Sequence, residues 1–138
     1  MKVVALSLKQ PWATLLVHGC KTIEVRKWPT PRRGPVLIHA ARVPDPRPEV
    51  WKLVPPELRE HTKLGGGIVG AAELVDCITY RTLPVFQADQ HLHLNLPEWY
   101  QDRLFGFVFR DARPLPFCKF PGWMRFFEVP GHAHDAAK

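Results

Sequence analysis

The sequence predicts an α+β protein: a small mixed β-barrel, closed or nearly closed, with a short helix near its start and further helices at the periphery. Three observations support this prediction. The length of 138 residues suits one domain, since single domains hold about 100–200 residues. A composition of 46% hydrophobic and 23% charged residues is typical of a globular core and excludes a largely disordered chain. Fifteen prolines and nine glycines are too many for a helix bundle and favour short strands joined by loops.

A strand and a short helix open the sequence. Residues 3–8 are mostly apolar and predict a strand that ends before Lys9. Pro11 suits a helix start, because its missing N–H would be unpaired there, and Gly19 suits the residue just past the helix end. Between them the apolar side chains recur at helical spacing. They predict a helix of about two turns whose buried stripe is Trp12, Leu15 and Leu16.

From Lys21 onward the pattern changes to a period of two, which predicts a strand. Ile23 and Val25 would face the core. The opposite, accessible face would carry Thr22, Glu24, Arg26 and Trp28. The turn that follows ends at Gly34 and leads into a second apolar strand over residues 35–41.

The remaining sequence predicts more strands than helices. A weak pattern favours a helix over residues 50–59, which Pro55 and Pro56 must begin or break. Residues 68–79 form an apolar run typical of a buried central strand, and residues 81–103 are assigned mostly to loop. Further extended segments are expected at residues 104–109, 114–121 and 123–129.

The chain would form a single domain over residues 1–130, and residues 131–138 would form a flexible tail.

Several broad classes of protein are excluded. No uncharged run approaches the roughly 20 apolar residues of a bilayer helix, and no signal peptide is recognised at the start. We therefore expect a cytoplasmic protein without membrane contact. Three cysteines, odd in number and distant in sequence, indicate neither a disulfide framework nor a zinc site, and no metal or organic cofactor is implied.

The net charge of +6 is concentrated at the start of the chain. Residues 1–48 hold nine basic and two acidic residues, whereas residues 49–138 hold ten basic and eleven acidic residues. If the first third folds onto one side, this distribution favours an anion-binding face. The alternative is a solvated basic surface that aids solubility.

Three charged residues after the predicted helix form the candidate site. Glu24 and Arg26 leave the same face of their strand, and Lys21 lies in the turn where its flexible stem can reach that face. Glu24 would orient Arg26, while enough positive charge remains to hold a phosphate. The alternative is an ordinary surface ion pair, which contributes about 0–1 kcal/mol.

Two tryptophans and a glutamine adjoin these charges. Trp12 and Trp28 would offer stacking surfaces for a base, which contribute roughly 1–3 kcal/mol each in single-strand binders. Gln10 would read the edge of a base. The alternative for Trp12 is a purely structural role in the core.

Two further features flank the candidate site. Arg33, together with Lys27 and Arg32, would extend a track for a phosphate backbone, or would simply be a solvated turn. His39 on the neighbouring strand would either face the cleft or serve as a structural barrel histidine.

The residues around the predicted helix match a known family pattern. Gln10-Pro11-Trp12 precedes the pattern G-x-K-x-x-E-x-R, which is formed by Gly19, Lys21, Glu24 and Arg26. Further matches are the Arg33-Gly34-Pro35 turn and the Ile38-His39-Ala40 strand. In these residues the chain resembles the ASCH domain family, named for activating signal cointegrator homology, and the likeness spans nearly the whole chain.

The resemblance implies a PUA-like barrel with a cleft beside the first helix that takes RNA, another single-stranded nucleic acid, or a nucleoside or nucleotide ligand. Some small bacterial members are instead amidohydrolases that deacylate acylated cytidine with a lysine, a threonine and a glutamate. Glu24 occupies the position of that threonine here. As an enzyme, the chain would use Lys21 as nucleophile or base and Glu24 or Glu73 as proton carrier. A protein-interaction module is the third alternative.

Overall fold

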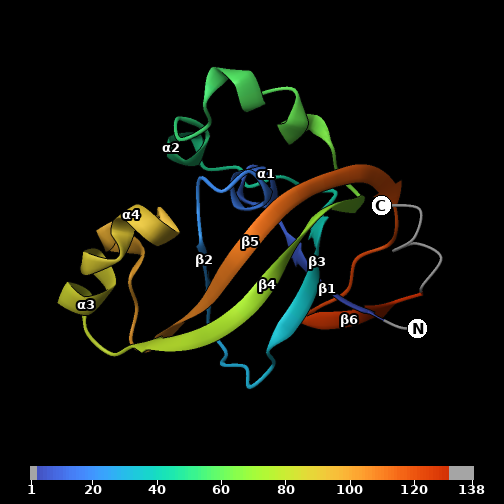
Figure 1. The fold of residues 1–138 in the computed structure, drawn as a ribbon. Helices are drawn as coiled ribbons and strands as arrows, with labels where there is room; N and C mark the ends of the chain where they lie inside the picture. Colours follow the sequence, from blue (N-terminus) through green and yellow to red (C-terminus); the bar gives the residue numbers. More distant parts are fainter. Residues whose placement is uncertain (1–2, 131–138) are drawn as a thin grey trace.

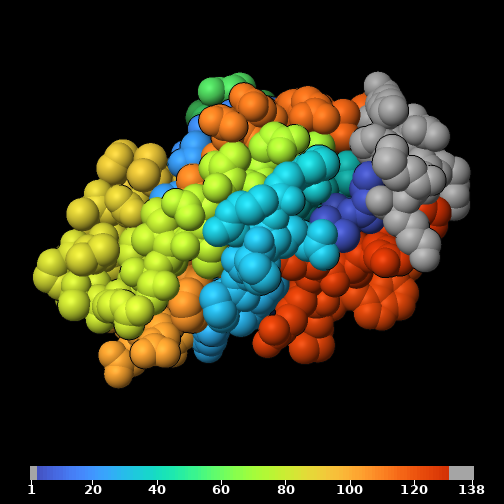
Figure 2. Space-filling model, turned by 60° about the horizontal axis from the view of Figure 1, so that its bottom comes forward, coloured from blue at the N-terminus to red at the C-terminus, as the bar shows by residue number. Residues whose placement is uncertain are grey.

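The computed structural model describes residues 3–130 and contains one six-stranded sheet in the order β2-β5-β4-β3-β1-β6. The strands are β1 (Val3–Leu8), β2 (Ile23–Arg26), β3 (Gly34–Ala40), β4 (Gly67–Tyr80), β5 (Leu104–Lys119) and β6 (Phe126–Val129). Only β1 and β3 pair in parallel among these strands; the other ladders are antiparallel. The long strands β4 and β5 curve around the first helix (Figure 1), and β4, β3, β1 and β6 follow one another across the outer face (Figure 2). The predicted α+β, PUA-like barrel is confirmed as a curled half-barrel.

Side chains link β2, at one edge of this curled sheet, to β1 and β6 at its opposite side. Nη2 of Arg26 on β2 donates a hydrogen bond of 2.8 Å to the backbone oxygen of Ser7 on β1. Trp28, just after β2, meets Phe126 of β6 edge to face at 5.7 Å. Within residues 3–130 the sheet has no backbone ladder between β2 and β6. Arg26, the last residue of the G-x-K-x-x-E-x-R segment, and Trp28, two residues further on, therefore connect the two sides of the sheet.

The first helix, α1 (Trp12–Val17), lies inside the curl. Its bounds confirm the prediction, because Pro11 precedes it directly and Gly19 follows it with a positive φ of 79°. All six of its residues are buried, not only the expected stripe. Strands β3, β4 and β5 contact α1 from several sides, which leaves it no solvent-facing surface.

The predicted helix over residues 50–59 is wrong. The structure instead has α2 (Pro48–Trp51), followed by the 3₁₀ turns η1 (Pro56–Leu58) and η2 (His61–Lys63). Pro55 adopts an extended conformation, because the residue before a proline is pushed out of the helical region. This separates α2 from η1.

The prediction of mostly loop for residues 81–103 is also wrong. This segment contains α3 (Leu83–Ala88), α4 (Gln90–His93) and η3 (Pro97–Trp99). Phe86 of α3 stacks on His93 of α4 at 4.2 Å, and both side chains are fully buried. Because each of these helices buries a single residue, neither leaves a periodic pattern in the sequence.

The C-terminal half of the sheet follows the prediction with shifted bounds. The two segments expected at residues 104–109 and 114–121 form one continuous strand, β5, whose pairing with β4 is interrupted by register shifts. The last strand, β6, begins at Phe126, so that residues 121–125 form a loop before it. The predicted tail over residues 131–138 lies outside the described residues.

The described part of the chain contains three cysteines. Cys20, Cys77 and Cys118 are free thiols. No helix within residues 3–130 is long and apolar enough to cross a bilayer. The same residues contain no group of three or more His, Cys, Asp and Glu side chains placed to hold a metal ion.

Gly70 provides a test of how α1 fits into the curl. A Cβ at Gly70 would lie 2.4 Å from Cγ1 of Val17 and 2.5 Å from the backbone oxygen of Arg113. We expect Gly70→Ala to lower the free energy of unfolding by about 1–3 kcal/mol, the usual effect of overpacking a core. Urea unfolding measures this change, and an unaltered midpoint would contradict the close packing of α1 on β4.

Candidate functional site

Glu24 lies at the centre of a charged network on β2. Its Oε1 is 3.3 Å from Nζ of Lys21, and its Oε2 accepts a hydrogen bond of 3.0 Å from Nε of Arg26. The side chains of Lys21, Glu24 and Arg26 are 0%, 12% and 20% exposed. The structure therefore brings together the three charged residues singled out in the sequence, in a mostly buried position.

Lys21 is fully buried, and its ammonium group is saturated with acceptors. Nζ donates hydrogen bonds to the backbone oxygens of Ile23 at 2.7 Å and His93 at 3.0 Å, in addition to its ion pair with Glu24. The ammonium also lies 4.7 Å from the centre of the Trp12 ring. Burial lowers the pKa of Lys21, and the carboxylate of Glu24 opposes this shift. The lysine expected in an open cleft thus lies beneath the surface, where its three donors join β2 to α4.

An open hollow of about 590 Å³, called the central pocket below, lies beside this network. Glu24 and Arg26 line it, whereas Lys21 does not. Its lining also includes the basic residues Lys9, Arg47 and Arg125 and the aromatic residues Trp12, Trp28 and Trp123. Among the described lining residues, four basic side chains outnumber the two carboxylates, which are those of Glu24 and Asp45.

Asp45 fixes one wall of the central pocket. Its Oδ2 accepts hydrogen bonds from Nε1 of Trp12 at 3.0 Å and from Nη2 of Arg47 at 2.6 Å, and its Oδ1 accepts from the backbone N–H and Nε of Arg47. Burial alone would raise the pKa of Asp45, but the hydrogen bonds from Arg47 and Trp12 outweigh it and lower the pKa to about 2. The carboxylate thereby holds both an aromatic and a cationic wall residue in place.

Four residues that line the central pocket were not predicted from the sequence: Lys9, Arg47, Trp123 and Arg125. The guanidinium of Arg47 lies 3.8 Å from the ring centre of Trp99, and that of Arg125 lies 4.8 Å from the ring centre of Trp28. Lys9 is exposed, and within residues 3–130 it forms no ion pair. In the sequence Arg125 follows two large apolar residues, Trp123 and Met124. The strand predicted over residues 123–129 concealed that Arg125 lies in the loop before β6.

Gln10 and Trp12 mainly stabilise the structure around the site and contribute little to its exposed surface. The side-chain amide of Gln10 donates to the backbone oxygens of His61 and Leu64 and accepts from the N–H of Thr14, so its polar atoms are occupied. Gln10 is buried and lines none of the described pockets. Trp12 is 8% exposed. It belongs to the core, as one of the two alternatives predicted, and it also lines the central pocket.

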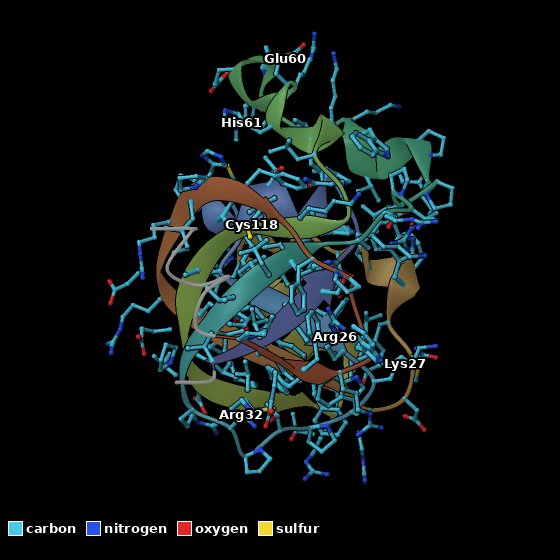
Figure 3. The ribbon with its side chains drawn as sticks, turned by 90° about the vertical axis from the view of Figure 1, so that its right-hand side faces the viewer. Arg26, Lys27, Arg32, Glu60, His61 and Cys118 are labelled. Carbon is cyan, nitrogen blue, oxygen red and sulfur yellow. The ribbon has the colours of Figure 1, made fainter. Side chains whose placement is uncertain are left out.

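The second basic cluster is divided by the fold. Lys27 lines a neighbouring hollow of about 660 Å³, together with Arg26 and Arg47. Arg33 lies in the loop between β2 and β3, donates to the backbone oxygen of Thr30 and lines none of these hollows. Figure 3 shows Arg26 within the outline of the ribbon and Arg32 near its lower edge.

His39 and Glu73 also lie apart from the central pocket. His39 on β3 is buried and lines a different hollow, beside the loop before β6. Glu73 on β4 lies opposite Pro35 and Arg110 in the sheet and lines none of the three hollows. Glu24 is therefore the acidic side chain next to Lys21 that also reaches the central pocket.

A model of the ASCH domain matches residues 6–116, from β1 into β5. The chain belongs to the ASCH domain family. This ASCH domain is 31% identical over 149 residues to activating signal cointegrator 1 of Mus musculus and 30% identical to that of Homo sapiens. These alignments cover 96% of the chain but 23% of each relative, so the chain spans less than a quarter of their length.

Solved structures share the fold of this ASCH domain. The crystal structure of ASCH from Zymomonas mobilis superposes with a TM-score of 0.68, at 15% sequence identity, over 96% of this chain and 91% of that chain. A point mutant of the same bacterial protein gives a TM-score of 0.68 at 16% identity, over 98% and 95% of the two chains. At these identities the similarity establishes the fold alone.

The hydrogen bonds at Asp45 predict a pH-dependent stability. Its folded pKa of about 2 lies below that of an unfolded aspartate, so the stabilisation is present above about pH 4 and is lost as the pH falls through 2. We expect Asp45→Asn to destabilise the domain by about 2 kcal/mol at pH 7, and by progressively less as the pH approaches 2. Urea unfolding at several pH values measures this difference, with Asp102→Asn, which changes an exposed carboxylate, as control. A difference that does not shrink in acid would contradict the assignment.

The buried ammonium of Lys21 predicts a structural effect of its removal. Lys21→Met keeps the length of the side chain but leaves two backbone oxygens and one side of Glu24 without their donor. We expect a loss of about 3 kcal/mol in the free energy of unfolding, as for other broken buried ion pairs. Lys52→Met, at an exposed position, should change it by less than about 0.5 kcal/mol. Equal stability of the two variants would place Lys21 at the surface instead.

Proposed function

We propose that this ASCH domain binds RNA or another single-stranded nucleic acid through the central pocket. The observation that carries this proposal is the combination of four basic side chains and three tryptophans around one open hollow. Basic groups attract the phosphate backbone, and aromatic faces stack on bases of any sequence. Membership of the ASCH domain family, from which the sequence led us to expect a nucleic-acid ligand, supports the same class of ligand.

Phosphate would be held by the cations at the rim of the central pocket. Lys9 and Arg125 are exposed, and neither forms an ion pair within the described part of the chain. Arg47 is 41% exposed although Asp45 binds it, so that its guanidinium keeps a solvent-facing side. Arg26 is less suited to bind phosphate, because its Nε and Nη2 already donate hydrogen bonds to Glu24 and to the backbone oxygen of Ser7.

A base would be recognised at the inner wall. Trp28 is held edge-on by Phe107 and Phe126, and the guanidinium of Arg125 lies over its ring. The carboxylate of Glu24 lines the same wall, with its orientation fixed by Lys21 and Arg26. A carboxylate in this position accepts hydrogen bonds from the amino group of a base, and so favours bases that carry one. Lys21 would act as a positioning residue behind Glu24.

The amidohydrolase alternative has less support. A nucleophilic or basic lysine must reach its substrate, but Nζ of Lys21 is buried and already donates to two backbone oxygens beside its ion pair with Glu24. Glu73, the other candidate proton carrier, lies elsewhere in the sheet. Binding without turnover is therefore the function we propose.

Loss of the rim cations tests the proposed function. We expect Lys9→Ala and Arg125→Ala each to weaken binding of a fluorescein-labelled single-stranded RNA on the order of three- to tenfold, and to reduce the slope of log affinity against log salt by about 0.7. Fluorescence anisotropy over a salt series measures both quantities. Arg81→Ala, which removes an exposed arginine that lines none of the three hollows, serves as control.

Two outcomes would overturn the proposed function. One is affinity and salt dependence that are the same for all three variants and the unmodified protein. The other is deacylation of an acylated cytidine, followed by ultraviolet absorbance, that a folded Lys21→Met variant no longer performs. The latter outcome would assign the domain to the amidohydrolases.

A further inference from the structure

A second hollow of about 920 Å³, called the loop pocket below, adjoins the central pocket. Both hollows are lined by Ser7, Lys9, Ala41, Trp123 and Met124. Trp123 is 62% exposed and Met124 is 87% exposed, so the two largest exposed apolar side chains of the loop before β6 stand between the hollows. The two hollows are thus neighbouring parts of one surface.

The lining of the loop pocket combines flat apolar groups with positive charge. Phe120, Pro121 and Trp123 supply apolar and aromatic walls, and Arg42 and Lys119 supply cations in addition to the shared Lys9. Among residues 3–130, no aspartate or glutamate lines it. A ligand that fits must offer both a flat apolar group and a negative charge, and a nucleotide offers both.

The loop that carries Trp123 is held in a defined position. Nε2 of His39 is 2.7 Å from the backbone oxygen of Phe120, and Nδ1 of His39 is 2.9 Å from Oγ of Ser7. Because a carbonyl oxygen only accepts, Nε2 carries the hydrogen and Nδ1 accepts from the serine hydroxyl. Gly122 packs directly on this imidazole, since a Cβ there would lie 2.7 Å from Cε1 of His39. His39 thereby fixes the loop, and an aromatic face that is fixed in advance loses less entropy on binding.

We infer that the loop pocket is a subsite for a second nucleotide of the same strand, whose base stacks on Trp123 while Arg42 and Lys119 hold its phosphate. The inference rests on the proposed function and deepens it. The ligand of this ASCH domain is then an oligonucleotide of two or more nucleotides that crosses the ridge of Trp123 and Met124, not a single nucleoside or nucleotide.

The inference predicts that affinity depends on the length of the ligand. Isothermal titration calorimetry would compare a nucleoside monophosphate with the di-, tri- and tetranucleotides of the same base. We expect affinity to rise about tenfold or more between one and three nucleotides, as stacking of one further base gives.

Variants that alter only the loop pocket separate the two subsites. Arg42 and Lys119 line the loop pocket but not the central pocket. The double variant Arg42→Ala/Lys119→Ala should weaken trinucleotide binding about tenfold and leave mononucleotide binding unchanged. Arg81→Ala/Arg113→Ala removes two exposed arginines that line neither hollow and should affect neither ligand.

Repositioning of the loop gives an independent measurement. Gly122→Ala should displace the loop from His39 and weaken trinucleotide binding. Because Trp123 and Arg125 of the same loop also line the central pocket, mononucleotide binding should weaken too, but by less. Thermal unfolding of each variant, followed by circular dichroism, would confirm that the fold is retained.

The outcomes distinguish this inference from the proposed function. If the trinucleotide binds, depends on Lys9 and Arg125, and is indifferent to the Arg42/Lys119 double variant, the second subsite is overturned while the proposed function stands. Equal loss for mononucleotide and trinucleotide in the double variant would also overturn it, because the loop pocket would then be the only site. If no oligonucleotide binds the unmodified protein, the proposed function itself fails.

Discussion

The carboxylate of Glu24 is the group on which the closure of this domain depends. It neutralises the buried ammonium of Lys21 on one side and the guanidinium of Arg26 on the other. Through these two cations it joins α4, by way of the backbone oxygen of His93, and β1, by way of that of Ser7, to its own strand. Burying charges is costly unless each is paired and hydrogen-bonded. Because every donor of Lys21 is used, the three residues form a unit that holds the open side of the half-barrel together before any ligand is considered.

This arrangement separates the basic residues into two groups with different physical roles. The charges of Lys21 and Arg26 are neutralised by ion pairs with Glu24 inside the protein, and a phosphate would have to compete with this carboxylate for them. Lys9 and Arg125 are exposed without a carboxylate partner in the described part of the chain, and their charge extends into solvent, where it attracts anions over about a Debye length. Arg47 is intermediate, because Asp45 holds it while its side chain stays 41% exposed. A residue of the family pattern such as Lys21 can therefore be necessary to the central pocket without lining it, because it holds the residues of the wall in position.

Local patterns predicted most of the sheet, but not the parts that tertiary contacts decide. The strand at residues 3–8 and the helix between Pro11 and Gly19 follow from alternation, period and end residues that lie within a few positions of one another. The short helices between residues 81 and 103 depend on one aromatic contact, Phe86 on His93, which no local pattern reveals. The same limit applies to the site. The shared face of Glu24 and Arg26 follows from a period of two, whereas the burial of Lys21 requires α4 to cover it, and α4 was not predicted.

The sheet order explains why residues that line the two pockets come from distant parts of the chain and meet at one end. β1 runs parallel to β3, so Leu8 lies beside Ala40, and the chain leaves both strands in the same direction towards Lys9 and Arg42. Antiparallel pairing adds the start of β4 and the end of β5, where Gly67 lies beside Ala40 and Lys119, and it places the start of β6 beside Leu6. Four connections thus converge at one end of the sheet, while the ladders that bring them there lie in the core. Such loops can change length and composition at little cost to the sheet, so the extent of the central pocket and the loop pocket can vary while the Lys21, Glu24 and Arg26 closure stays the same.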